Sequence, residues 1–178
     1  LEELSLVKRA KKGDIEAFGL LYEQIYRDLY KFALFTLKDA SDAEDVVGEA
    51  VTDAFETIGK LRSEEAFRGW MFRILANKCR RMLKAYGKRP TLREYGEAPY
   101  GWESGEVRET AREDLMDLKK AFDGLEEEDR LIVALAFFGG YSSQEIGKIL
   151  GKKPGTVRSR QSRALSRMRA FLTGSYGL

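Results

Sequence analysis

The sequence contains no histidine and only one cysteine, Cys79. Without histidine the chain lacks the usual general base for neutral pH, and with one cysteine it cannot form most zinc sites, disulfides or Cys-His arrangements. Cys79 lies in a largely apolar helical stretch, which favours a small buried residue over a reactive thiol. We therefore expect no enzyme activity, no cofactor, no metal site and no small-molecule substrate.

Long apolar runs are also lacking. The longest, Leu131 to Phe138, is far shorter than the ~20 residues that cross a bilayer. No charged segment followed by an apolar one opens the sequence as a signal peptide would. We therefore expect a cytoplasmic protein without direct insertion into a membrane. Hydrophobic residues at 43% and charged residues at 34% indicate a globular chain with a core.

The modest net charge of +2 hides a strong segregation of charge along the chain. Residues 39–56 include seven acids and no base, whereas residues 148–169 include eight bases and no acid. The sequence thus predicts one acidic and one basic surface, each suited to a different partner.

Apolar residues recur at helical spacing near both ends of the chain, and no alternating pattern of strand length competes with them. This predicts an all-α fold. Two of the three prolines and several glycines lie between Gly87 and about Arg108, which is typical of a linker. We expect two helical domains, residues 1–87 and 109–178, joined by a flexible linker at residues 88–108.

Two capping-box patterns, Ser41-x-x-Glu44 and Ser142-x-x-Glu145, predict helix starts. Gly151 predicts the end of the second of these helices, and Pro154 suits the first turn of a last helix. Two helices joined by a short turn that contains glycine are typical of a helix-turn-helix.

The last helix carries a basic stripe with hydroxyl side chains, as major-groove docking requires. We expect Arg160 and Arg163, in the middle of the exposed stripe, to read bases, since arginine forks recognise guanine edges. The other expected DNA contacts are Lys152, Lys153 and Arg167 to phosphates, together with Thr156 and Ser159, and Arg158 about one helical step from the stripe. The opposite face, Val157, Ala164, Leu165, Met168 and Leu172, should pack. The alternative is an ordinary solvated charged face.

The acidic segment places five carboxylates three or four residues apart, and therefore on one helical face. They are Asp42, Asp45, Glu49, Asp53 and Glu56. Solubility alone could explain such a face. A basic protein partner is the more plausible reason, because DNA binding would not favour a large acidic surface.

A third stripe combines an aromatic residue, an amide and several cations. It comprises Trp70, Arg73, Asn77, Arg80, Arg81 and Lys84, interleaved with apolar residues. Such a face suits unstacked bases and phosphates, as in the binding of a melted DNA strand. The alternative is that Trp70 is a core residue, because tryptophans are largely buried on average.

At these positions the sequence resembles a known family. The segments Gly140-Tyr141-Ser142-Ser143-Gln144-Glu145-Ile146 and Gly155-Thr156-Val157-Arg158-Ser159-Arg160 resemble the sigma-4 domain of extracytoplasmic-function sigma factors. Asp42-Ala43-Glu44-Asp45-Val46-Val47 resembles their polymerase-binding signature, and Phe67-x-x-Trp70-x-x-Arg73-Ile74-x-x-Asn77 their promoter-melting helix in sigma-2. The resemblance covers nearly the whole chain in the right order. Gly147, where alanine is usual, and Gln161, where leucine is common, depart from the pattern.

The resemblance implies an RNA polymerase sigma factor, which directs promoter recognition, promoter opening and transcription initiation. It implies that the acidic face binds the clamp region of the largest subunit of core RNA polymerase. It further implies that the last helix recognises the upstream element of promoter DNA, that the Trp70 helix opens the downstream element, and that the loop from Gly59 to Ala66 captures a flipped base. An anti-sigma factor is a further implied partner.

Two other functions remain as alternatives. One is a stand-alone helix-turn-helix regulator whose first domain senses a ligand or dimerises. The other is a magnesium-dependent nuclease using Asp42, Glu44, Asp45 and Glu49, although neighbouring helical positions scatter those carboxylates around the helix axis.

Overall fold

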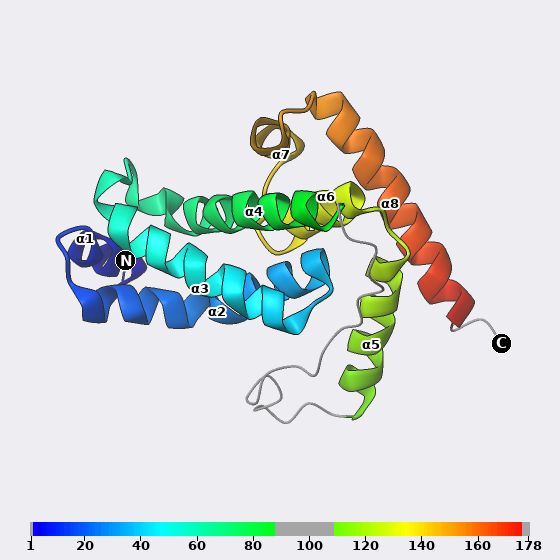
Figure 1. The fold of residues 1–178 in the computed structure, drawn as a ribbon, viewed down its shortest axis with the longest axis horizontal. Helices are drawn as coiled ribbons and strands as arrows, with labels where there is room; N and C mark the ends of the chain where they lie inside the picture. The colour runs from blue at the N-terminus through cyan, green and yellow to red at the C-terminus, as the bar shows by residue number, and fades with distance from the viewer. Residues whose placement is uncertain (1, 88–108, 176–178) are drawn as a thin grey trace.

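The computed structural model describes residues 2–87 and 109–175, and every regular element within them is a helix (Figure 1). The all-α fold class is confirmed. The expected linker, residues 88–108, lies outside the described residues. The helices are α1 (Glu2–Ala10), α2 (Ile15–Leu37), α3 (Ala40–Thr57), α4 (Phe67–Tyr86), α5 (Glu109–Asp123), α6 (Glu127–Phe137), α7 (Ser143–Leu150) and α8 (Pro154–Ser175), with 3₁₀ helices Ile58–Lys60 and Glu64–Ala66 between α3 and α4.

Helices α1–α4 pack together as a first helical group, in which α2, α3 and α4 run side by side (Figure 1). The turn between α2 and α3 is short because Lys38 adopts a left-handed conformation with φ 61°, which ends α2. Asp39 then caps α3, its carboxylate accepting a hydrogen bond from the Asp42 amide at 2.9 Å. The expected capping by Ser41 is therefore wrong by two residues. Asp39, the first acid of the acidic segment, is the N-cap of α3.

Helices α5–α8 form a second helical group, in which α7 and α8 make the expected helix-turn-helix. The capping box is confirmed, since the Ser142 amide donates to the Glu145 carboxylate at 2.8 Å and the Glu145 amide donates to the Ser142 hydroxyl. Gly151, at φ 67°, ends α7 as expected. A Cβ on Gly147 would lie 2.5 Å from the Lys152 carbonyl oxygen, so this tight turn has no space for the alanine that is usual there.

An aromatic cluster joins the two groups. Phe35 on α2 has no exposed surface, and its ring centroid lies 4.8 Å from that of Phe122 and 5.6 Å from that of Phe138. The buried residues of both groups form one continuous cluster around this point. The position of α6 against α2 is therefore determined by shared core packing.

Cations of the first group meet the carboxyl ends of helices in the second group. The Lys38 ammonium donates to the Asp123 carbonyl oxygen at 3.2 Å and contacts the Asp123 carboxylate at 2.8 Å, at the end of α5. The Arg68 guanidinium donates to the Phe138 carbonyl oxygen at 3.1 Å, just after α6. Helix carboxyl ends carry partial negative charge, so these contacts reinforce the apolar contact between the groups.

Candidate functional site

The acidic face lies along α3 but is less uniform than expected. Asp45 and Glu56 are exposed, whereas Asp42 is half-buried and accepts a hydrogen bond from the Tyr86 hydroxyl. Glu49 and Asp53 keep 63% and 49% of their side-chain surface exposed. All five carboxylates therefore lie on one side of α3, where Asp45, Glu49 and Glu56 are exposed.

Lys78, which the sequence reasoning missed, contacts this face from α4. Its side chain is only 8% exposed, and its ammonium lies 2.7 Å from the Asp53 carboxylate and 3.3 Å from that of Glu49. The spacing from Leu75 and Met82 places Lys78 in the packed register of α4, which could have revealed it. Lys78 thus joins the acidic face to the helix that carries Trp70.

The stripe on α4, which we call the Trp70 face, consists of Trp70, Arg73, Asn77, Arg80, Arg81 and Lys84. Arg73, Asn77, Arg81 and Lys84 are exposed. Trp70 is half-buried, packs against the core and has its ring centroid 6.2 Å from that of Phe67. Arg80 is also half-buried, because its guanidinium donates to the Ile149 carbonyl oxygen at 2.8 Å, at the end of α7. Trp70 thus packs partly against the core, as the alternative expected, and keeps part of its surface exposed, as a base-stacking role requires.

A cavity of about 690 Å³ lies where the Trp70 face meets the second helical group. It is lined by Trp70 and Arg73 of α4, by residues 60–63 and 65–66, and by Tyr141 with neighbouring residues of the second group. Tyr141 packs against α4, since a Cβ on Gly69 would lie 3.5 Å from the Tyr141 hydroxyl. Burial in this position raises the pKa of Tyr141 to about 12. The segment expected to capture a flipped base therefore borders a cavity beside Trp70.

The basic face of α8 is largely open to solvent. Its exposed members are Lys153 before the helix and Thr156, Arg158, Ser159, Arg163 and Arg167 along it. On the opposite side Val157, Ala164 and Met168 are buried as expected, but the expected burial of Leu165 is wrong, since it is 47% exposed. Gln161, which stands where the resembled family commonly has leucine, is half-buried.

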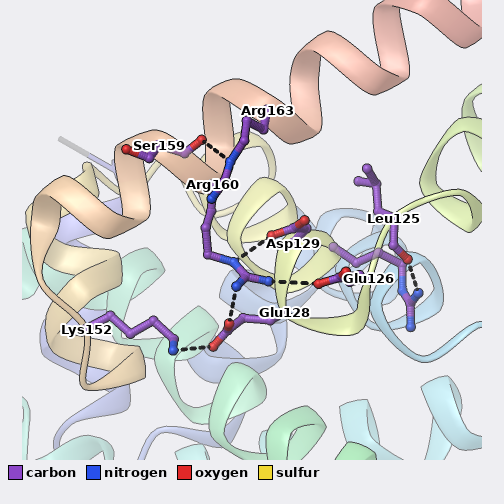
Figure 2. A network of polar contacts seen from close by, with 9 residues as sticks. Leu125, Glu126, Glu128, Asp129, Lys152, Ser159, Arg160 and Arg163 are labelled. Atoms are coloured by element: carbon purple, nitrogen blue, oxygen red, sulfur yellow. Dashed lines mark hydrogen bonds and ion pairs between the residues drawn. The ribbon is translucent and has the colours of Figure 1, made fainter.

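Arg160 does not lie exposed in the middle of this face, and that expectation is wrong. Figure 2 shows its side chain extending toward the start of α6. Its Nε lies 2.7 Å from the Asp129 carboxylate, and its two Nη atoms lie 3.0 Å from that of Glu128 and 3.2 Å from that of Glu126. Lys152 contacts the other oxygen of Glu128 at 2.7 Å. We call these residues the α6–α8 network.

The α6–α8 network holds Arg160 more firmly than a base contact would. Burial alone would lower the pKa of Arg160, but the hydrogen bond to Asp129 and the three carboxylates raise it above its usual value. The Asp129 side chain is 9% exposed, and leaving a buried charge without its partner costs ~3–5 kcal/mol. A bidentate arginine contact contributes only ~1–3 kcal/mol of base discrimination. Releasing Arg160 to read a base is therefore unfavourable.

Within residues 2–87 and 109–175, no three or more His, Cys, Asp or Glu side chains gather as a metal site would need. The carboxylates of the nuclease alternative are thus not brought together. Among the helices of those same residues, none is both long and apolar enough to span a bilayer.

Comparison with known proteins agrees with both helical groups. The family described as Sigma-70 region 2 matches residues 21–89, and the family described as Sigma-70, region 4 matches residues 121–170. The ECF RNA polymerase sigma-E factor of Escherichia coli K12 is 33% identical over 176 residues, covering 92% of this chain and 91% of the relative. The RNA polymerase sigma-H factor of Pseudomonas aeruginosa is 30% identical over 173 residues, covering 92% and 90%.

A solved structure supports the fold in the same way. The sigma factor RpoE of Bartonella quintana, crystallised with the anti-sigma factor NepR, superposes with a TM-score of 0.70 at 23% identity, covering 89% of this chain and 98% of that one. The matched families, the relatives and the helical arrangement agree along nearly the full length. The chain therefore belongs to the ECF family of RNA polymerase sigma factors.

Proposed function

We propose that residues 1–87 form the domain that binds core RNA polymerase and opens promoter DNA. Residues 109–178 form the domain that recognises the upstream promoter element, and residues 88–108 link the two. The exposed acidic face on α3 and the exposed basic face on α8 support this division, because one chain offers separate surfaces of opposite charge to two different partners.

The acidic face binds a basic surface of the polymerase. Asp45, Glu49 and Glu56 are its exposed members, and Asp42 and Asp53 complete the face. Lys78 on α4 forms ion pairs with Glu49 and Asp53 of this face.

The Trp70 face holds the opened downstream element. Trp70 offers a stacking surface beside the cavity, and exposed Asn77 can hydrogen-bond to an unpaired base. Arg73, Arg81 and Lys84 are available to phosphates, and Arg80 becomes available when its bond to Ile149 is released.

The basic face of α8 enters the major groove at the upstream element. Arg163 and Arg158 are the arginines open to base edges, with Thr156 and Ser159 as hydroxyl donors. Lys153 and Arg167 hold phosphates, which orients the helix without reading sequence.

The protein acts in the bacterial cytoplasm, where RNA polymerase works, and as a recruiting factor rather than an enzyme. An anti-sigma factor is a further partner, supported by the complex of the similar Bartonella RpoE with NepR.

The exposed acidic face carries this proposal, and charge reversal tests it. Asp45→Lys combined with Glu56→Lys should weaken binding to purified core polymerase strongly, measured by fluorescence anisotropy, with circular dichroism unchanged. The matched control, Glu16→Lys with Glu23→Lys, makes the same charge change at exposed positions of α2 and should bind normally. Equal affinity of the two double variants would contradict the assignment, and DNA binding without any polymerase would favour the stand-alone regulator.

A further inference from the structure

The α6–α8 network connects three separate parts of the second helical group. Glu126, Glu128 and Asp129 come from the start of α6, Lys152 from the turn of the helix-turn-helix, and Arg160 from the second turn of α8 (Figure 2). Glu128 bridges two of these parts, with one carboxylate oxygen toward Lys152 and the other toward Arg160. Such a connection constrains both the position and the rotation of α8.

All three guanidinium nitrogens of Arg160 contact carboxylates at the start of α6. Its Nε and both Nη atoms each have a carboxylate oxygen within 3.2 Å, so each nitrogen of the planar guanidinium already has a charged partner. A guanine contact would need two parallel N–H groups on one edge. Asp129 is largely buried and would lose its arginine in that exchange.

The rotation of α8 decides which side chains reach the groove. Arg158, Ser159 and Arg163 flank Arg160 on the helix and are exposed, whereas Val157 and Ala164 are buried. A rotation by one residue, ~100° around a helix, would turn the exposed arginines away from the bases. The network therefore holds α8 in the rotation that leaves Arg158, Ser159 and Arg163 exposed.

We propose that Arg160 is a positioning residue, held by Asp129, that sets the orientation of the DNA-reading helix. This rests on the proposed function, because it assumes that α8 reads the upstream element. Arg160 then contributes to the affinity for every promoter sequence, and it does not change the base preferred at any position.

The test compares Asp129→Asn, Arg160→Ala and their combination, each assembled with core polymerase, on a promoter library randomised in the upstream element. We expect each single change to weaken binding roughly tenfold, within the range for residues coupled in one ion-pair network. The double variant should be no weaker than either single variant, and the preferred sequence should stay the same.

A base-reading Arg160 gives the opposite pattern. Asp129→Asn would release the arginine and leave affinity equal or higher, and Arg160→Ala would relax preference at one base position; either result overturns the proposal. If Arg160→Ala fails to fold, Asp129→Asn decides alone, because it keeps the arginine. The exchanged variant, Asp129→Arg with Arg160→Asp, keeps an ion pair between the two positions but has no arginine at position 160. If it binds the original promoter better than the single variants, the ion pair supports binding without an arginine that could read a base.

Arg163→Ala on the same helix separates this proposal from the function it rests on. Relaxed preference with Arg163→Ala, together with normal binding by Asp129→Asn, would overturn the positioning role alone. Unchanged binding and preference with Arg163→Ala would overturn DNA reading by this helix, and the positioning proposal with it.

Discussion

Replacing Phe35 with alanine should loosen the contact between the two helical groups. The Phe35 ring is fully buried and contacts Phe122 near the end of α5 and Phe138 just after α6. Burial of roughly 200 Å² of phenylalanine surface contributes about 5 kcal/mol. Because the alanine methyl keeps part of this and the site relaxes incompletely, we expect the free energy of unfolding to fall by ~3–5 kcal/mol.

Phe137→Ala is the matched control. This residue lies at the end of α6, next to Phe138, but is 72% exposed. Its removal should change the free energy of unfolding by no more than ~0.5 kcal/mol, as for most surface substitutions. The two variants thus remove the same side chain from neighbouring parts of the structure, one inside the joint core and one outside it.

Urea unfolding followed by circular dichroism gives the free energies, and small-angle X-ray scattering gives the separation of the groups. We expect Phe35→Ala to lower stability and increase the radius of gyration in the absence of denaturant, and Phe137→Ala to change neither. If Phe35→Ala is no more destabilising than Phe137→Ala, and the radius is unchanged, the joint core does not hold the groups together in solution.

Three further results are expected. Trp70→Ala with Asn77→Ala should reduce promoter opening, seen as permanganate reactivity, far more than promoter binding; normal opening would refute the base-holding role. Gly147→Ala should lower the free energy of unfolding by ~1–3 kcal/mol because the added Cβ overpacks the turn, whereas an unchanged urea midpoint would show that the turn has space. Hydrogen bonds from Ser142 lower the pKa of Glu145. The unchanged protein should therefore be more stable than Glu145→Gln above about pH 4.3. This difference in the free energy of unfolding should vanish as the pH falls through the lowered pKa of Glu145. A stability difference that does not shrink as the pH falls would contradict this.

Local signals in the sequence predicted local structure well. The Ser142 capping box, the end of α7 at Gly151 and the start of α8 at Pro154 each depend on residues only a few positions apart, and all three are present. The error at Ser41 has the same local origin, because Asp39 offers an equally good capping carboxylate two residues earlier. Short-range hydrogen bonding therefore fixes the elements that carry the candidate surfaces.

Long-range pairing could not be predicted in the same way. The helical spacing of Arg160 is right for the basic face, but its partner Asp129 lies 31 residues earlier in the chain, and only the packing of α6 on α8 brings them together. Lys78 likewise meets Asp53 only because α3 packs against α4. The helical period of a sequence shows which face of a helix a residue occupies. Tertiary packing decides whether the charge on that residue is available to a binding partner.

Promoter-dependent transcription tests the central claim most directly. The purified chain would be added to core RNA polymerase with a library of bacterial promoter fragments, and run-off transcripts would be sequenced. We expect transcripts from a defined set of promoters that core polymerase alone does not use, lost with Asp45→Lys and Glu56→Lys and redirected with Arg163→Ala. Transcripts that are the same with and without the chain, although it is folded and in excess over the core enzyme, would contradict the account.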